Sequence, residues 1–432
     1  MRFDQLSSQS TRAASACAIA LGFTIPISVA ADNILLSIIL LLWLVGNRWR
    51  EGAATLHANR VAQAAIALFL LLAIGILWGS QPADGLRMLG KFVDLAFVPV
   101  FVSLFVAERA RRHAAAALTS SLLLTLCLSS LLWAGLWPDN WLVIGTAREP
   151  EIFKKYLTQS VLLAIGAYMF ALFALDAPTN RARAFFAIAA LLCVANVTLM
   201  LSGRSGQLVL AALAMYFAFA RWRWRGLLVM VLAFFVLALS IGTGGWGVRG
   251  GTAQSIADST GLRDGSWTTV PRDFKAWQKS GISNTSTGQR LDYAINSATI
   301  VIAHPLTGVG TGGFAAAYAR QVKGTGSEAT VNPHNEFLNI AVQLGLPGLA
   351  LLVLLLAVGW QCSKGLPTLL ERDLARGLII AYAVGCMINS MLMDHVEGLF
   401  FAWALGVLFG GWRMRSTSAR QCVHDSVHSH HH

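Results

Sequence analysis

The sequence predicts an all-α polytopic membrane protein with about twelve transmembrane helices and one large helical loop on the outer side of the membrane. Of the 432 residues, 56% are hydrophobic and only 12% are charged, whereas a soluble globular chain carries roughly 25% charged residues. The hydrophobic residues gather in runs near the roughly 20 residues that a helix needs to cross a bilayer. The connection between residues 244 and 333 is much longer than the others and is rich in glycine and charge.

Twelve apolar runs are candidate spanning helices, and the short ones favour tilted or broken helices. The first run has a second interpretation as a cleavable signal peptide, because Arg2 and Arg12 precede its apolar part and Ser28-Val29-Ala30 ends it. Cleavage there would leave the rest of the topology unchanged. The runs cover residues 13–30, 32–47, 61–79, 86–107, 114–137, 157–175, 184–202, 205–220, 226–243, 346–362, 374–393 and 397–412.

The basic residues set the predicted orientation. The formal net charge is +12, and most Lys and Arg side chains fall in alternate short loops, which the positive-inside rule places in the cytoplasm. Both termini are therefore expected inside and the large loop outside, and the charge indicates membrane topology rather than a nucleic-acid partner. The loops assigned to the cytoplasm include Arg221, Arg223, Arg225, Lys364, Arg372 and Arg376, whereas the opposite short loops contain only Arg87, Arg148, Lys154, Lys155 and Arg204.

Four segments follow from this topology. Nine predicted helices precede the outer loop and three follow it, and we interpret the last residues as a disordered cytoplasmic tail. The tail ends in HDSVHSHHH, which is more typical of disorder or of a purification-tag remnant than of a metal site. The segments are 1–243 (helices), 244–345 (loop with the candidate catalytic segment), 346–415 (helices) and 416–432 (tail).

The large loop is expected to carry function, because long loops without structure of their own are uncommon. Residues 244–265 have the composition of turns, and residues 271–279 and 289–303 have helical spacing. In the second of these segments Leu291, Ile295, Ala298 and Ile302 are predicted to share one apolar face. The stretch 308–313 matches GxGxxG, but it follows a helical pattern and no βαβ unit surrounds it, so we interpret it as a tight turn that returns the chain to His334.

His334 is the first candidate catalytic residue. It lies in PHNEFLNIAVQLGLPG, residues 333–348, where the loop returns to an apolar helix and where Asn332-Pro333 predicts a turn. A histidine titrates near pH 6.5 when unperturbed, so at neutral pH its imidazole can accept a proton from a hydroxyl group. A single histidine at a helix start is more often structural, so the residues around it decide the interpretation.

Two arginines and one aspartate are candidates for substrate binding. Arg204 lies in LSGRSG between two apolar runs, where a cation is costly without a partner, and the alternative is that it contacts lipid headgroups. Arg290 begins the second loop helix, and the alternative there is a solvated charge. The guanidinium of each matches phosphate oxygens. Asp394, beside His395 in the last outer loop, can orient an imidazole, hold an arginine, or simply form a polar turn.

Metal and disulfide chemistry are not predicted. The sequence contains neither a pair of carboxylates of the glycosidase kind nor a DxD cluster, so any transfer reaction is expected to need no metal and no cofactor. Lys91 and Asp94, three residues apart in one run, are expected to pair with each other. No CxxC spacing occurs among the six cysteines, which are Cys17, Cys127, Cys193, Cys362, Cys386 and Cys422.

Taken together, these motifs resemble the O-antigen ligase family of Gram-negative inner membranes. The most specific part is His334-Asn335 followed after nine residues by Gly345-Leu346-Pro347-Gly348. The supporting parts are Arg290 with HPLTGVG downstream, Arg204 within SGRSG, and Asp394 near the last helix. The departure from the family pattern is Tyr293, which stands where a tryptophan is expected after the loop arginine. The resemblance extends over nearly the whole chain.

This resemblance implies a fold like that of C-type glycosyltransferases and an active site on the periplasmic face. The implied donor is O-antigen on undecaprenyl diphosphate, and the implied acceptor is a sugar hydroxyl of the lipid A–core oligosaccharide. His334 would then be the general base and Arg290 the second catalytic residue. Arg290 and Arg204 would bind the diphosphate and offset its charge as it leaves, and Asn335 and Asp394 would contact substrate. Direct displacement would invert the anomeric centre. The resemblance implies membrane lipids as surroundings and no particular oligomeric state.

Three other functions remain as alternatives. Protein O-oligosaccharyltransferases resemble the chain in the His-Asn motif but tend to add a soluble C-terminal portion, whereas here about twenty residues follow the last run. O-antigen polymerases tend to have two large periplasmic loops, whereas the loop at 138–156 is short. A transporter of lipid-linked substrates would place charges at mid-membrane and show repeated halves, and we see no such repeat.

Overall fold

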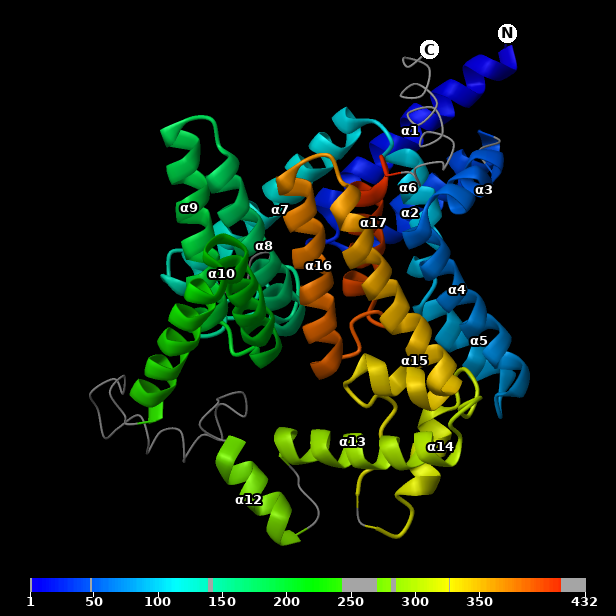
Figure 1. The fold of residues 1–432 in the computed structure, drawn as a ribbon, viewed down its shortest axis with the longest axis vertical. Helices are drawn as coiled ribbons and strands as arrows, with labels where there is room; N and C mark the ends of the chain where they lie inside the picture. The colour runs from blue at the N-terminus through cyan, green and yellow to red at the C-terminus, as the bar shows by residue number, and fades with distance from the viewer. Residues whose placement is uncertain are drawn as a thin grey trace, which may run out of the picture.

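The computed structural model describes residues 2–46, 49–138, 143–242, 270–280, 285–325 and 327–412, and within these ranges the chain is all-α, as the sequence predicts. The helices before the large loop form most of an upright bundle (Figure 1). They are α1 (Arg2–Thr24), α2 (Val29–Val45), α3 (Trp49–Ala58), α4 (Arg60–Gly75), α5 (Pro82–Lys91), α6 (Asp94–Leu104), α7 (Glu108–Trp133), α8 (Tyr156–Asp176), α9 (Asn180–Ala195) and α10 (Arg204–Gly242).

The second half of the chain adds helices of two kinds. Three lie near the lower end of the bundle, where α13 runs across it, and three join the upright helices (Figure 1). They are α12 (Val270–Ser280), α13 (Ser286–Ala303), α14 (Phe314–Gln321), α15 (Glu336–Cys362), α16 (Leu369–Ile388) and α17 (His395–Phe409). Residues 244–265, with their turn composition, and the tail 416–432 lie outside the described residues.

Several helices have the length and apolar composition of membrane spans. Among the described residues five qualify, and α2 and α17 are shorter apolar helices. These helices confirm a helical membrane protein, while the count of twelve spans and the sides that their loops face stay predictions. The five candidate spans are Arg60–Trp78, Glu108–Trp133, Tyr156–Asp176, Asn180–Met200 and Glu336–Gly365.

Helix α10 consists of two arms joined by a turn. Arg223 has a φ of 52° and a ψ of −137°, which are not helical. A Cβ built on Gly226 would lie 2.3 Å from the carbonyl oxygen of Ala218, although residues eight apart in a straight helix are about 12 Å apart along the axis. The chain therefore reverses here, in agreement with the two separate runs predicted on either side of residues 221–225.

The prediction of one continuous helix at 86–107 is wrong in one detail. The structure divides it into α5 and α6, with a turn at Phe92 and Val93. The expected pairing of Lys91 with Asp94 fails for the same reason, because the turn places the two side chains in different surroundings. Lys91 is exposed, whereas Asp94 is buried, with its Oδ2 3.9 Å from Nδ1 of His395.

The two predicted loop helices are confirmed as α12 and α13, but the predicted apolar face of α13 does not pack into a core. Ile295 is 51% exposed and Ile302 is 79% exposed. The buried residues of the helix are Gly288, Asp292, Ser297 and Ile300. Asp292 accepts a hydrogen bond of 2.8 Å from the indole of Trp277 on α12. The helix therefore buries mainly small and polar side chains.

The glycine-rich stretch 308–313 forms the tight turn that the sequence predicts. Gly308, Gly310 and Gly312 have φ values of 63°, 86° and 81°, a region that side chains with a Cβ rarely adopt. The backbone amides of residues 309 and 310 donate to the carbonyl oxygens of Val342 and Gln343, both at 2.9 Å. The turn therefore packs against the first turns of α15, directly after His334.

Gly345→Ala is expected to destabilise this junction. Gly345 interrupts α15 with a φ of 68°, and an added Cβ would lie 2.6 Å from the carbonyl oxygen of Pro305. Strain of this kind costs about 1–3 kcal/mol, which a lower melting temperature of the purified protein would report. The matched control is Gly90→Ala on α5, where a Cβ meets no atom within 4 Å. Equal melting temperatures for the two variants would contradict the prediction.

Candidate functional site

His334 is held in an unusual backbone conformation directly before α15. Its φ is 51°, and only one other described residue that is not glycine has a positive φ. Asn332 fixes this turn, because its Oδ1 accepts hydrogen bonds from the amide of His334 at 2.8 Å and from the hydroxyl of Ser390 at 2.7 Å. The loop that carries the histidine is thereby attached to the segment after α16.

Asn335 makes a second attachment between the same two segments. Its Oδ1 caps α15 by accepting from the amide of Leu338 at 3.0 Å, and its Nδ2 donates to the carbonyl oxygen of Met387 at 2.8 Å. Asparagine is among the preferred N-cap residues because its side chain satisfies an amide that the first helical turn leaves free. Both polar atoms of Asn335 thus hold the start of α15 against the end of α16.

The imidazole of His334 lies between an amide and an aromatic ring. Its Nδ1 is 3.3 Å from Oδ1 of Asn389, and its ring stacks on Tyr293 of α13 with centroids 6.2 Å apart and planes 24° apart. With the amide oxygen of Asn389 facing the ring, the tautomer that fits this contact has its proton on Nδ1 and its lone pair on Nε2. The ring is therefore oriented with a proton acceptor on the side away from Asn389.

Glu336 fixes the segment that carries Asn389 and Asp394. It is fully buried, and its Oε2 accepts from the amides of Leu392 at 2.7 Å and Met393 at 3.1 Å. A carboxylate satisfies two buried amides here, which would otherwise cost about 1–3 kcal/mol each. Glu336 was not among the predicted site residues, because a glutamate at the first position of a helix is ordinary and does not by itself indicate burial.

The two arginines meet where α10 and α13 begin. Nη1 of Arg204 donates to the hydroxyl of Thr287 at 3.2 Å, and Arg290 lies one turn further along α13. Burial, and next the charge of Arg204, lowers the pKa of Arg290. In the described part of the chain no carboxylate lies within 4 Å of the Arg290 guanidinium. The N–H groups of both guanidiniums are of the kind that match the oxygens of a phosphate.

Helix α13 connects the arginines to the histidine. Arg290 and Tyr293 are three residues apart, so they lie on one face of the helix with a separation of about 4.5 Å along its axis. Tyr293 stacks on His334. Arg204, Arg290 and His334 are far apart in sequence, and they are linked through α13 by the contacts of Thr287 and Tyr293. Helix α13 itself crosses the end of the bundle (Figure 1).

Asp394 is a charged neighbour of His334 rather than its hydrogen-bonding partner. It is partly buried before α17, and burial raises its pKa, while the charges of Lys91 and His334 act in the opposite direction. Within the described ranges its carboxylate accepts no hydrogen bond from His334 or from an arginine, and Asn389 makes the contact to the imidazole instead. Asn389 was not among the predicted site residues, although the polar pair Asn389-Ser390 interrupts the predicted apolar run 374–393.

The positive charge of this site comes from side chains. The described residues include no group of three or more His, Cys, Asp or Glu arranged to hold a metal ion.

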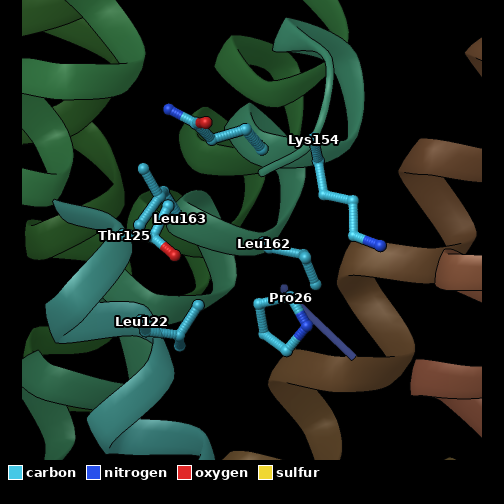
Figure 2. Close-up of a pocket in the computed structure, with 7 residues that line it drawn as sticks. Pro26, Leu122, Thr125, Lys154, Leu162 and Leu163 are labelled. Atoms are coloured by element: carbon cyan, nitrogen blue, oxygen red, sulfur yellow. The ribbon is translucent and has the colours of Figure 1, made fainter. Parts of the chain in front are cut away.

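A separate cavity inside the bundle, near Pro26 and Leu122, has a volume of about 10 Å³, which is room for about one water. Lys154 extends past this cavity and away from Leu122 and Thr125 of α7 (Figure 2). We therefore place no ligand there.

A comparison with known families bears on the same elements. The model of the O-antigen ligase family matches residues 188–353, a range that contains Arg204, Arg290, His334 and Asn335 but not Asp394. A comparison with curated proteins finds no significant match. Residues 188–353 thus carry an O-antigen ligase domain, and for this part of the chain the resemblance predicted from the motifs is confirmed.

Proposed function

We propose that the protein transfers O-antigen polysaccharide from undecaprenyl diphosphate to the lipid A–core oligosaccharide, at the periplasmic face of the Gram-negative inner membrane. The family domain supports a membrane glycosyltransferase of the ligase and polymerase superfamily. The observation that carries the proposal lies along α13, where the imidazole of His334 stacks on Tyr293, one helical turn from Arg290, and where Arg204 contacts Thr287.

In the proposed reaction, His334 acts as the general base. Its Nε2 takes the proton from the acceptor hydroxyl, whose oxygen forms a bond to the anomeric carbon of the donor sugar. The bond between that carbon and the diphosphate oxygen breaks, and the electron pair stays on the diphosphate. Attack from the side opposite the leaving group inverts the anomeric centre. Asn389 keeps the proton on Nδ1, so that Nε2 stays free to accept.

The arginines stabilise the leaving group. Negative charge grows on the diphosphate as the glycosidic bond breaks, and preorganised cations near that oxygen lower the barrier. Arg290 and Arg204 are held in place before substrate arrives, with Arg204 fixed by Thr287. This arrangement needs no metal ion. Asn335 contributes through the position of His334, and Asp394 through the charge beside it.

The test is complementation of a Gram-negative strain that lacks its own ligase. Expression of the wild-type chain is expected to restore a ladder of capped lipid A–core on a gel. A chain that yields no ladder but glycosylates a co-expressed pilin would be a protein O-oligosaccharyltransferase. In a strain that lacks its polymerase, conversion of single repeats into long chains would identify an O-antigen polymerase. Either of these two results would overturn the proposal.

Asp394→Asn is expected to lower transfer roughly tenfold and to raise the melting temperature at pH 8. The charge beside His334 is expected to supply part of the roughly 10²- to 10⁴-fold contribution of a general base, which neighbouring groups tune. Burial raises the pKa of the Asp394 carboxyl in the folded protein. The protonated carboxyl therefore stabilises the folded protein fully at a pH below the pKa that Asp394 has in the unfolded chain, and this stabilisation is lost as the pH rises through the pKa in the folded protein. The neutral asparagine avoids that loss.

The gain in melting temperature should shrink as the pH falls into the range of an ordinary aspartate. Asp84→Asn on α5 is the control, because Asp84 is more exposed and faces Arg87 at 3.4 Å. Its melting temperature is expected to change little or to fall. A lower melting temperature for Asp394→Asn at pH 8 would show instead that Lys91 stabilises the ionised carboxylate, and it would contradict the prediction.

A further inference from the structure

A second cavity lies at the end of the bundle opposite His334. Its volume is about 240 Å³, just below the roughly 300–1,000 Å³ of typical small-molecule sites. Since His334 precedes the first turn of α15 and Trp360 lies in its last turn, the helix separates the two sites by most of its length. We call the cavity the basic pocket, and the residues that define it are Tyr216, Arg221, Trp360, Arg372, Asp373 and Arg376.

The basic pocket carries excess positive charge. Three arginines line it against one carboxylate, and Asp373 is already engaged, with its Oδ2 3.0 Å from Nη2 of Arg221. Arg372 and Arg376 have no carboxylate within 4 Å among the residues that the structure describes. Two guanidiniums beside a cavity therefore lack the counter-charge that such a setting normally supplies.

Of the two arginines, Arg376 is oriented by the protein, and Arg372 has a buried donor to offer. The Nε of Arg376 donates to the hydroxyl of Ser363 at 3.1 Å, and its guanidinium lies over the ring of Trp360 at 5.0 Å. The Nε of Arg372 is buried and has no hydrogen-bond partner in the described chain. A guanidinium that is stacked on one face still presents its edge, where its N–H groups match the oxygens of a phosphate.

The pocket lies at a level typical of lipid headgroups. Trp222 and Trp224, directly after Arg221, are 61% and 70% exposed, and exposed tryptophans mark the boundary between membrane and water. The arginines belong to the loops that the charge pattern assigns to the cytoplasm, where basic pockets between spanning helices bind anionic headgroups. A lipid can reach such a pocket from the side of the bundle.

We propose that the basic pocket binds the phosphate of an anionic phospholipid in the leaflet opposite the proposed active site. Arg372 and Arg376 would contact the phosphate, and the acyl chains would lie along α10 and α16. The lipid would join helices α10, α15 and α16. Because α10 begins at Arg204 and α15 begins beside His334, its binding is expected to stabilise the helices that present the transfer site.

The experiment uses the purified full chain in a neutral detergent, so it does not depend on transfer activity. Phosphatidylglycerol, phosphatidylcholine and inorganic phosphate are added separately, and bound lipid is measured by native mass spectrometry together with the melting temperature. The variants are Arg372→Gln with Arg376→Gln as a pair, and Asp373→Asn alone. The control is Arg112→Gln on α7, whose side chain is 75% exposed and faces Glu108.

Phosphatidylglycerol is expected to bind the wild type and Arg112→Gln equally, and to bind the paired variant about tenfold more weakly or worse, since each basic residue near a headgroup adds attraction. Asp373→Asn removes the only carboxylate of the pocket, so it should bind more tightly. Equal binding by the wild type and the paired variant would overturn the proposal.

Two further outcomes need separate treatment. The first distinguishes a soluble phosphate from a phospholipid as the ligand, and the second applies if the paired arginine variant does not fold. If inorganic phosphate alone raises the melting temperature as much as phosphatidylglycerol, the ligand is a soluble phosphate and the lipid assignment is wrong. If the paired variant does not fold, Asp373→Asn decides, because unchanged or weaker binding of phosphatidylglycerol by that variant would overturn the proposal. Phosphatidylcholine, which has no net charge, is expected to give little effect.

Discussion

Replacing His334 by asparagine is expected to reduce transfer roughly 10²- to 10⁴-fold, the usual contribution of a general base, with no loss of folded protein. The acceptor hydroxyl then has no group to take its proton, while the arginine pair still binds the donor. Donor affinity is therefore expected to stay near that of the wild type. Turnover of a lipid-linked donor with purified lipid A–core acceptor measures the loss.

Asparagine is a better replacement than alanine at this position. His334 has a φ of 51°, a conformation that asparagine adopts more readily than most residues with a side chain. Alanine would add backbone strain to the loss of the imidazole, and a fall in activity could then come from a displaced loop. His334→Asn keeps the turn that Asn332 fixes and removes the titratable ring alone.

The pH dependence separates a base from a positioning residue. If His334 is the base, the pH profile of wild-type transfer should contain a step that is missing from the small remaining activity of His334→Asn. The control is His113→Asn, on the exposed face of α7, which should behave as the wild type. Full activity of His334→Asn would show that the arginines alone carry the catalysis.

The helices could be predicted because their signals are local. The apolar pattern stops between residues 220 and 226, where three arginines occur, and the structure turns the chain back at Arg223. The turn between α5 and α6 gave no such signal, since Phe92 and Val93 are themselves apolar and continue the run. A break of this kind is decided by packing, as shown by Phe92, which is fully buried.

The site could be predicted only in part, for a related reason. His334, Arg290 and Arg204 stand out by residue type within motifs. Their partners do not, because Asn389 lies 55 residues from His334 and no spacing links the two. The exposed face of α13 is another case, since helical periodicity identifies which residues share a face but not which face the protein covers.

Neutralising either arginine is expected to weaken transfer by about 10- to 100-fold, because a hydrogen bond to a charged group contributes about 1.5–3 kcal/mol. Arg290→Gln should also raise the melting temperature in the absence of donor. Burial and the charge of Arg204 both lower the pKa of Arg290, so its charged form is disfavoured in the folded protein. Arg320→Gln, at the exposed end of α14, is the control and should change neither quantity.

A double-mutant cycle with Arg204→Gln then tests whether the two arginines bind one diphosphate. If they act on the same anion, the loss in the double variant should differ from the product of the two single losses, since contacting groups with a shared partner are not additive. Arg290→Lys should recover only part of the activity, because lysine keeps the charge but lacks the planar fork. Additive losses, with full recovery by lysine, would mean that the two charges act separately at long range. In that case Arg290 on α13 would not share a common anion site with Arg204, and leaving-group stabilisation would have to come mainly from Arg204 at the start of α10, held by Thr287 of α13.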